Sequence, residues 1–378
     1  MAATGGFVPP PYPYERLDAL KRLADSLPGG VVDCSIGTPC DPVPEVAAAA
    51  ATAALSASNG YPQSAGSPAL RDAAAAWIAR RFGVTVDAAH VGACVGTKEL
   101  VTSLPHHLRL RTPARDTVLY PSIAYPSYEM GAVLAGCRAV PVALDAEWHL
   151  DLASVSDADA ERALLLWVNE PGNPSSSTAD DAYFARVTAW ARERGVLVAS
   201  DECYCEFSPQ PATILTQGLD GVLAMHSVSK RSNLAGMRVG FYAGDADVVE
   251  YLVETRKHAG LMVPTVAQAA AAAALGDDAH VDAQRARYEE RGGLVGAALA
   301  AHGLVHDGGD ASFYLWLRTA DGADDGWEIA ARLAHAAGLL VSPGDLYGAL
   351  GADHVRLALV QPRDRLELAL DRLVRARA

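Results

Sequence analysis

The feature that most constrains the fold is an alternation of short apolar runs with segments of helical periodicity, which begins near residue 90. The segment Ala179–Arg194, for example, carries Tyr183 and Val187 at helical spacing. Six apolar or β-branched runs have the length of strands: Thr117–Tyr120, Ala139–Leu144, Ala163–Asn169, Val196–Ser200, Gly221–His226 and Arg238–Ala243. Strands that are apolar throughout and separated by helices predict a mostly parallel sheet covered by helices on both faces.

The pattern changes beyond residue 258. We expect the alanine-rich helix over Thr265–Leu275 to continue into the charged segment His280–Arg291. We expect strands at Phe313–Leu317, Leu339–Ser342 and Val355–Val360, interleaved with helices at Trp327–Ala337 and Arg363–Arg377. This part of the chain therefore predicts a smaller α+β domain.

A chain of 378 residues is long enough for two domains. We predict a large α/β domain over residues 46–258 and a small domain over residues 259–378. Residues 1–45, with a helix near Tyr14–Leu27, are expected to pack on the small domain.

Composition excludes several classes of function. With 31 basic and 45 acidic residues, the net charge of −14 argues against nucleic acid as a partner, because phosphate binding requires a basic face. No apolar run reaches the length of about 18 residues that spans a bilayer, and no signal-peptide pattern opens the chain. The six cysteines lack the spacing of a disulfide framework. We therefore expect a cytoplasmic protein with reduced thiols that binds no membrane.

Lys230 follows the apolar run Gly221–His226 and is flanked by hydroxyl side chains. A lysine amine must lose its proton to attack an aldehyde, and burial at a strand end lowers its pKa. Ser227 and Arg238 are spaced to bind one phosphate, Arg238 through two donors. The segment thus suits a phosphorylated aldehyde cofactor, although a lysine considered alone is more often a surface residue.

Two further polar groups follow predicted strands. Asp201 ends a buried strand, where a carboxylate is costly unless it meets a cation, such as a protonated pyridine nitrogen, or hydrogen-bond donors. Tyr204 is placed to donate to a ring oxygen, and Asn173 lies in a turn after the strand Ala163–Val168. Considered separately, Asp201 is equally well explained as the N-cap of a helix, and Asn173 as a residue of an ordinary turn. Because ligands of open α/β sheets bind beyond the carboxyl ends of the strands, these groups are expected to meet Lys230 at one sheet edge.

A third element is the stretch Val95–Glu99, in which Gly96 precedes the helix Glu99–Leu108. Backbone N–H groups at a helix start bind anions, so Thr97 and Lys98 are candidates for the phosphate site. A glycine before a helix is common, and this signal is weak on its own.

The Ser-x-x-Lys spacing of Ser227 and Lys230 also matches an acyl-enzyme nucleophile motif. That interpretation needs the tripeptides Ser-Asp-Asn and Lys-Thr-Gly, which the chain lacks, and a serine at a helix start, whereas Ser227 ends an apolar strand. A metal centre is equally unsupported, because the adjacent His106 and His107 point in different directions on a helix and no His-Glu-x-x-His spacing occurs. We therefore expect no metal site.

Together, the motifs Asn173-Pro174, Asp201-x-x-Tyr204, Ser227-x-Ser229-Lys230 and Arg238 resemble those of the fold-type I, class I/II aminotransferases, which depend on pyridoxal 5′-phosphate (PLP). The resemblance covers essentially the whole chain and implies a seven-stranded large domain. The stretches Ser229–Gly236, Gly37–Pro39, Asp41–Pro44, Gly96–Leu100, Arg256–Gly260 and Ser342–Asp345 are more narrowly similar to N-succinyl-diaminopimelate aminotransferase of lysine biosynthesis.

The resemblance implies a role for each matching position. Lys230 is the expected Schiff-base and catalytic lysine, Asp201 the partner of the pyridine nitrogen, and Arg356 the arginine that clamps the substrate α-carboxylate. Gly37 is an expected substrate contact. The remaining cofactor residues are expected to bind the phosphate (Thr97, Lys98, Ser227 and Arg238), the ring oxygen (Asn173 and Tyr204) and the ring face (Tyr125). Tyr61 matches a tyrosine that reaches the partner subunit's phosphate, which implies a homodimer.

The sequence also departs from the family pattern. Ser175-Ser176 stands where the family usually has Thr-Gly. Met237 occupies a position that is usually Tyr, and Cys205 one that is usually a larger aliphatic residue. The segment Leu359–Arg363 also differs from the sequence that the family usually has. None removes a group that PLP chemistry requires. They leave open another class I/II aminotransferase (aromatic, alanine or a secondary-pathway paralogue), a PLP-dependent carbon–sulfur lyase, and a non-catalytic PLP-binding regulator.

For the distal carboxylate of a succinylated substrate, the candidate cations are Lys98, Arg231 and Lys257. Each of the three is also explained as an ordinary polar or phosphate-adjacent residue. The expected reaction moves an amino group between N-succinyl-LL-2,6-diaminopimelate and the pair 2-oxoglutarate and glutamate.

Overall fold

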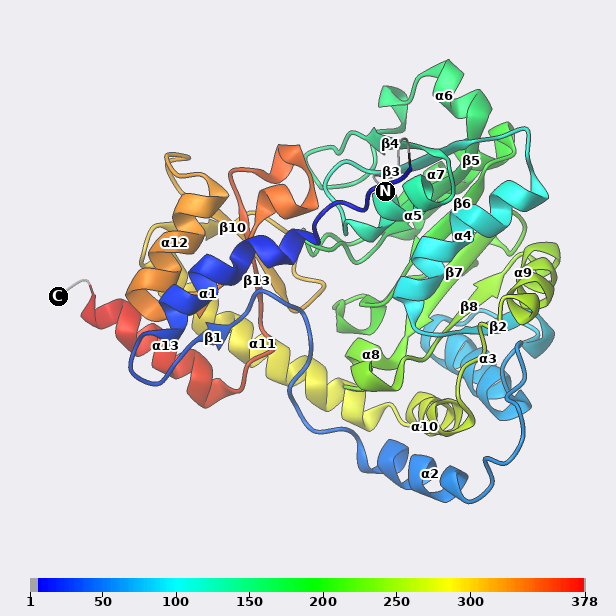
Figure 1. The fold of residues 1–378 in the computed structure, drawn as a ribbon, viewed down its shortest axis with the longest axis horizontal. Coiled ribbons are helices and arrows are strands. Elements are labelled where there is room, and N and C mark those ends of the chain that lie inside the picture. Colours follow the sequence, from blue (N-terminus) through cyan, green and yellow to red (C-terminus); the bar gives the residue numbers. More distant parts are fainter. Residues whose placement is uncertain (1–5, 377–378) are drawn as a thin grey trace.

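A seven-stranded sheet forms the centre of the larger part of the computed structural model, which describes residues 6–376 (Figure 1). In the order β2-β8-β7-β6-β5-β3-β4, only β8 runs antiparallel to its neighbours. The strands are β2 (Val91–Cys94), β3 (Thr117–Pro121), β4 (Arg138–Val142), β5 (Ala163–Asn169), β6 (Leu197–Asp201), β7 (Val222–Ser227) and β8 (Gly240–Gly244). The mostly parallel seven-stranded sheet is confirmed.

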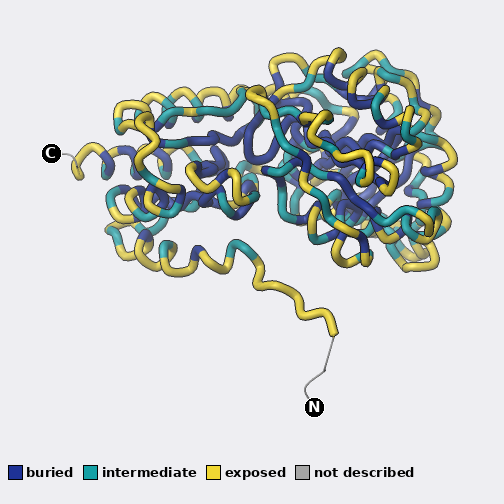
Figure 2. The backbone as a smooth tube through the Cα atoms, turned by 90° about the horizontal axis from the view of Figure 1, so that it is seen from above, coloured by how far each residue is buried: buried dark blue, intermediate teal, exposed yellow. Residues whose placement is uncertain are grey.

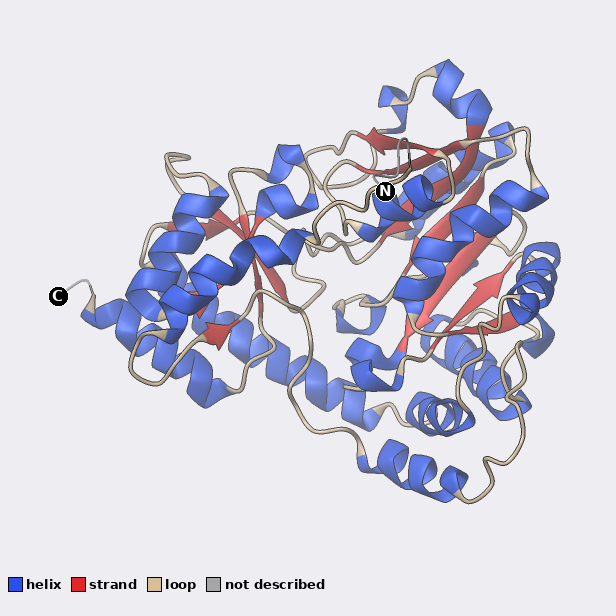
Figure 3. Ribbon diagram, viewed as in Figure 1, coloured by secondary structure: helices blue, strands red, loops and turns tan. Residues whose placement is uncertain are grey.

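Helices cover both faces of this sheet (Figure 3). In β5, Leu166 and Val168 join one apolar core, whereas Leu165 and Trp167 join another on the opposite face. The helices that contribute to the first core are α2 (Glu45–Leu55), α3 (Pro68–Phe82), α7 (Asp181–Arg194) and α10 (Thr265–Leu275). Those of the second are α4 (Thr97–Arg111), α5 (Ser127–Leu134) and α9 (Ala246–His258). Burial on both faces explains why the strands read as continuous apolar runs.

A second sheet lies in the C-terminal part, in the antiparallel order β12-β13-β10-β9. Its strands are β9 (Leu304–His306), β10 (Tyr314–Thr319), β12 (Ser342–Pro343) and β13 (Val355–Ala358). The helices around it are α11 (Ala279–Ala300), α12 (Gly326–Ala337) and α13 (Arg363–Arg375). Near the N-terminus, β1 (Val32–Asp33) pairs in parallel with β11 (Leu339–Leu340), and α1 (Asp18–Asp25) lies beside α12 (Figure 1).

Several elements differ from the sequence prediction. The predicted continuous helix is two helices, because the chain breaks at Gly276–Asp278 between α10 and α11. The predicted strand Leu339–Ser342 is split between β11 and β12, which belong to different sheets. The pattern did not predict β2, a run of only four residues that includes a glycine.

Three other points bear on the predictions. The domain boundaries stay a prediction, and residues 1–5 and 377–378, which include Arg377, lie outside the described residues. Between residues 6 and 376, no helix is both long enough and apolar enough to cross a membrane. The first described residues are exposed and extend away from the rest of the chain in the view of Figure 2.

The parallel register brings the predicted polar groups together. Asn169, the last residue of β5, pairs with Asp201, the last residue of β6. Asp201 pairs in turn with Met225 of β7, and Lys230 lies three residues beyond the end of that strand. All three chain segments therefore leave the sheet at its carboxyl edge, where ligands of α/β sheets bind.

Candidate active site

A cavity of about 470 Å³ opens at this edge. Every predicted site residue except Tyr61 lines it: Gly37, Thr97, Lys98, Tyr125, Asn173, Asp201, Tyr204, Ser227, Lys230, Arg238 and Arg356. A larger groove of about 1160 Å³ lies elsewhere, between residues such as Trp148, Asp181 and Gln210, and contains none of them. The smaller cavity is therefore the candidate active site.

Lys230 lines the cavity, and its amine donates a hydrogen bond to the carbonyl oxygen of Gly37. Burial lowers the pKa of Lys230 from 10.5 to about 8, and the charges of Arg356 and Arg238 act in the same direction. An amine with this pKa exchanges its proton readily near neutral pH, as a nucleophile and general base must.

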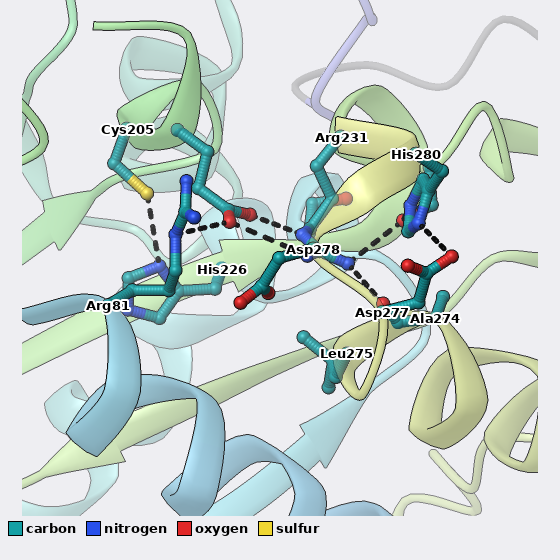
Figure 4. A network of polar contacts seen from close by, with 12 residues as sticks. Arg81, Cys205, His226, Arg231, Ala274, Leu275, Asp277, Asp278 and His280 are labelled. Carbon is teal, nitrogen blue, oxygen red and sulfur yellow. Dashed lines mark hydrogen bonds and ion pairs between the residues drawn. The ribbon is translucent and has the colours of Figure 1, made fainter. Parts of the chain in front are cut away.

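The residues after Lys230 are fixed to other elements (Figure 4). Arg231, which is buried, donates to the carboxylate of Glu206 and, through Nη1, to the Ala274 carbonyl at 2.9 Å. Arg81 also lies on Glu206, with its Nε 3.0 Å from Oε1. Because Arg231 points into this network and does not line the cavity, it is not the cation for a distal substrate carboxylate; that candidate was wrong.

Asp201 is a buried carboxylate held by two donors. The hydroxyl of Tyr128 donates to Oδ2 at 2.9 Å, and the backbone N–H of Cys203 donates to Oδ1 at 3.3 Å. Burial raises the pKa of Asp201, and no cation among the described residues offsets this effect. A protonated pyridine nitrogen is the partner that such a carboxylate lacks, so the residue fits the PLP ring.

The predicted phosphate end is built by backbone as well as side chains. Helix α4 begins at Thr97, and its N-cap residue Gly96 has φ 75° and supplies no side-chain cap. A Cβ atom at Gly96 would lie 2.2 Å from Nη2 of Arg238, so glycine lets this guanidinium approach the helix start. Ser227 ends β7 but also caps the short helix α8 (Val228–Arg231), accepting from the Ser229 N–H at 3.1 Å. The sequence interpretation placed Ser227 at a strand end only.

Arg356 is buried on β13 of the four-stranded sheet and lines the cavity. Its Nη1 donates to Oδ1 of Asn173 at 2.8 Å and its Nη2 to the Ser35 carbonyl at 2.5 Å, while Nε has no partner among the described residues. The guanidinium also lies 4.3 Å from the ring centre of Tyr314. A cation in the cavity wall that has no carboxylate partner among the described residues suits a carboxylate ligand.

Tyrosines complete the cavity. The hydroxyls of Tyr204 and Tyr314 lie 3.1 Å apart, and Lys98 donates to the hydroxyl of Tyr12 at 3.2 Å, with Nζ 5.8 Å from the ring centre of Tyr125. Tyr61 is 96% exposed between α2 and α3 and lies outside the cavity, so its contact with a partner subunit stays a prediction. Within residues 6–376, no group of three or more His, Cys, Asp or Glu side chains is placed to hold a metal.

Sequence reasoning missed several residues of this site. Tyr128 holds Asp201, and Asn169 donates to the Asp201 carbonyl at 2.9 Å while accepting from the Asn173 N–H at 2.9 Å. The position of Asn169 at the end of a predicted strand was a usable signal. Tyr314 was not identifiable, because it comes from β10 and meets Tyr204 only after the two parts of the chain pack together.

The comparisons with known proteins agree with the fold and site. Residues 30–373 match the family Aminotransferase class I and II, and the chain belongs to this family. It is therefore a PLP-dependent aminotransferase.

Among its relatives, a probable aminotransferase of Mycobacterium tuberculosis is 43% identical, over 96% of this chain and 85% of that protein. The 4-dedimethylamino-4-oxo-anhydrotetracycline transaminase OxyQ of Streptomyces rimosus is 40% identical, over 96% of this chain and 99% of that protein. A solved structure of a probable N-succinyldiaminopimelate aminotransferase from Thermus thermophilus is 29% identical, with a TM-score of 0.87, and covers 96% of this chain and 100% of that one.

Proposed function

We propose that this aminotransferase moves the amino group between N-succinyl-LL-2,6-diaminopimelate and 2-oxoglutarate, as a homodimer in the lysine pathway. The observation that carries the proposal is that Lys98 and Arg356 line the same cavity as Lys230 and face no carboxylate partner among the described residues. A substrate with an α-carboxylate and a distal carboxylate supplies one anion to each cation. The similarity to the Thermus thermophilus protein supports the same choice.

PLP supplies the electron sink that makes a Cα proton acidic. In the proposed site, Asp201 keeps the pyridine nitrogen protonated, while Asn173 and Tyr204 donate to the ring oxygen and Tyr125 packs on the ring face. The phosphate is held by the backbone N–H groups of Thr97 and Lys98 and by the side chains of Ser227 and Arg238, all of which line the cavity.

Lys230 performs the proton transfer in this proposal. Arg356 binds the α-carboxylate and so fixes which face of the substrate meets the amine. In this proposal the amine of Lys230, whose pKa is about 8, would accept the proton from the substrate Cα and deliver it to the C4′ carbon of the cofactor. The carbonyl of Gly37 accepts from this amine and orients it.

Of the three candidate cations for the distal group, Lys98 is the one that lines the cavity. Lys257 is exposed on α9, with its Nζ 3.5 Å from Oε2 of Glu254. We infer that Lys98 pairs with the succinyl carboxylate at the cavity mouth, next to Tyr12.

A second candidate function is transamination of a polycyclic ketone. It is favoured by the similarity to OxyQ over nearly the whole of that protein, and by the tyrosines Tyr12, Tyr14 and Tyr125 that line the cavity. Tyrosine rings would stack on a flat aromatic substrate, whereas the Lys98 charge would then have no anionic partner.

The experiment is a half-reaction assay on the purified holoenzyme, which follows the visible absorbance of the bound cofactor with a panel of amino donors. N-succinyl-LL-2,6-diaminopimelate is expected to react with a higher kcat/KM than LL-diaminopimelate, phenylalanine or alanine. Lys230→Ala is expected to abolish both the absorbance of the wild-type protein and turnover. Release of ammonia and pyruvate without an acceptor would indicate a lyase instead.

The role of Lys98 has a matched control. Lys98→Met is expected to raise KM for the succinylated donor by about 10-fold, the value of one charged hydrogen bond, and to leave KM for alanine unchanged. Lys257→Met, which removes an exposed lysine outside the cavity, is expected to change neither value. Equal effects of Lys98→Met on both donors would contradict the assignment.

A further inference from the structure

Glu99, in the stretch Gly96–Leu100, and Arg256, in the stretch Arg256–Gly260, have no role in the proposed function, and they form one ion pair. Glu99 is the third residue of α4, and Arg256 reaches it from α9. Nη1 of Arg256 lies 2.8 Å from Oε1 of Glu99, and Nη2 lies 2.6 Å from Oε2. Arg256 has 0% exposed surface, whereas the Glu99 side chain is 20% exposed, so the pair is a two-pronged contact that is partly open to solvent on the carboxylate side.

The carboxylate of Glu99 also fixes the start of α4. Its Oε2 accepts from the backbone N–H of Val95 at 3.1 Å, and its Oε1 accepts from the hydroxyl of Ser103 at 2.8 Å. Burial raises the pKa of Glu99, but the hydrogen bonds and charge of Arg256 outweigh that effect and hold this pKa below its usual value. Glu99 therefore carries a full negative charge in the first turn of the helix.

This charge lies in an unfavourable place for an anion site. The first turn of a helix attracts anions through its free N–H groups and the helix dipole. A carboxylate in that same turn competes with the attraction and repels a phosphate bound at Thr97 and Lys98. Arg238 approaches the helix start directly, but it is needed for the phosphate itself.

We propose that Arg256 is a positioning residue for the cofactor phosphate, which acts by neutralising Glu99 and holding the start of α4. The inference rests on the proposed location of the phosphate. It explains why a fully buried guanidinium, which is costly to desolvate, is placed against the first turn of this helix. Arg256 does not line the cavity, so it acts through Glu99 and not by contact with the cofactor.

The size of the effect follows from Coulomb's law. For an assumed separation of roughly 8 Å between the Glu99 carboxylate and one phosphate charge, and an effective dielectric constant of about 20, the repulsion would weaken phosphate binding by about 30-fold. Removal of Glu99 instead leaves the positive charge of Arg256 near the phosphate. The two partners of the ion pair are therefore expected to change PLP affinity in opposite directions.

The test is the Kd for PLP, measured by absorbance titration of the PLP-free protein at about pH 8, where carboxylates are ionised. Arg256→Met is expected to weaken PLP binding by about 30-fold. Glu99→Gln keeps the side-chain oxygen that accepts from Val95 and is expected to bind PLP at least as tightly as the parent protein. The double variant Glu99→Gln/Arg256→Met, and Arg256→Lys, are expected to stay within about 3-fold of the parent.

Three outcomes overturn the proposal. If the double variant binds PLP as weakly as Arg256→Met, the arginine acts by packing and not by charge. If Glu99→Gln weakens PLP binding, the ion pair acts as a structural unit. If Arg256→Met binds PLP like the parent, Glu99 does not act on the phosphate.

Two further variants separate this proposal from the proposed site. Arg238→Met is expected to weaken PLP binding both with Glu99 present and in the Glu99→Gln variant. If Arg238→Met instead binds PLP as tightly as the parent protein, the proposed location of the phosphate is wrong. Arg162→Met removes a two-pronged contact with Asp116 that lies on the surface, at the amino ends of the strands. This control is expected to leave the Kd for PLP unchanged.

Discussion

The buried amine of Lys230 costs the PLP-free protein stability, and replacing it by methionine is expected to recover most of that cost. The difference between the ordinary pKa of 10.5 and the folded pKa of about 8 corresponds to about 3 kcal/mol. The substitution also removes the hydrogen bond to the Gly37 carbonyl, worth about 1 kcal/mol. Lys230→Met is therefore expected to raise the free energy of unfolding by about 2 kcal/mol near neutral pH.

The gain depends on pH in a defined direction. Below about pH 8 the amine is protonated in both the folded and the unfolded chain, and the full cost is present. Between about pH 8 and 10.5 the unfolded chain binds the proton that the folded chain has released, so the stability of the wild-type protein rises with pH. Above 10.5 only the lost hydrogen bond remains, and the variant becomes less stable by about 1 kcal/mol.

Urea unfolding of both proteins, stripped of PLP and compared at one protein concentration, measures this difference at several pH values. Other titrating groups are common to the two proteins and cancel in the difference. A variant that is less stable than the wild type near neutral pH, or a difference that does not change with pH, would refute the reasoning. Either result would mean that the folded protein does not destabilise the ammonium of Lys230.

Three further predictions use the contacts around the site. Glu206→Gln removes a buried charge shared by two arginines and is expected to lower the free energy of unfolding by about 3–5 kcal/mol in urea titrations. Arg162→Met, which breaks an ion pair on the surface, is expected to change this free energy far less. Arg356→Lys is expected to lower kcat/KM for the amino donor by about 100-fold in steady-state assays, because a single ammonium cannot hold the carboxylate in the same orientation. The two Nη atoms of Arg291 lie 2.8 and 2.6 Å from the carboxylate of Asp41. Asp41→Asn removes this charge and is expected to lower the free energy of unfolding by about 2–3 kcal/mol in the same urea titration.

The sheet and its carboxyl edge were predictable because local pattern and global fold agree there. The run Ala163–Val168 is apolar throughout and makes up β5 except for its last residue, Asn169, since the part of a strand that packs on both faces needs apolar residues. Polar residues placed directly after such strands had to emerge at one edge. Asp201 and Lys230 could therefore be brought together without knowledge of any long-range contact.

The partners of those groups were not predictable in the same way. Arg231 follows Lys230 directly and was a reasonable candidate for the cavity, yet its side chain points to Glu206 and the end of α10. That choice depends on where a neighbouring carboxylate lies after packing. The pattern of apolar residues contains no such information, because it fixes faces and not the pairing of polar side chains.

The charge of the whole chain also gave no indication of the charge of the site. The net charge is −14, yet among the described residues Lys98, Lys230, Arg238 and Arg356 line the cavity against the single carboxylate of Asp201. A cavity with this excess of cations in an acidic protein concentrates anions locally, since low-dielectric walls strengthen the field within it. Under the proposed function, Arg238 would bind the phosphate of PLP and Lys230 its aldehyde carbon. Lys98 and Arg356 would then remain for the two carboxylates of the proposed succinylated substrate.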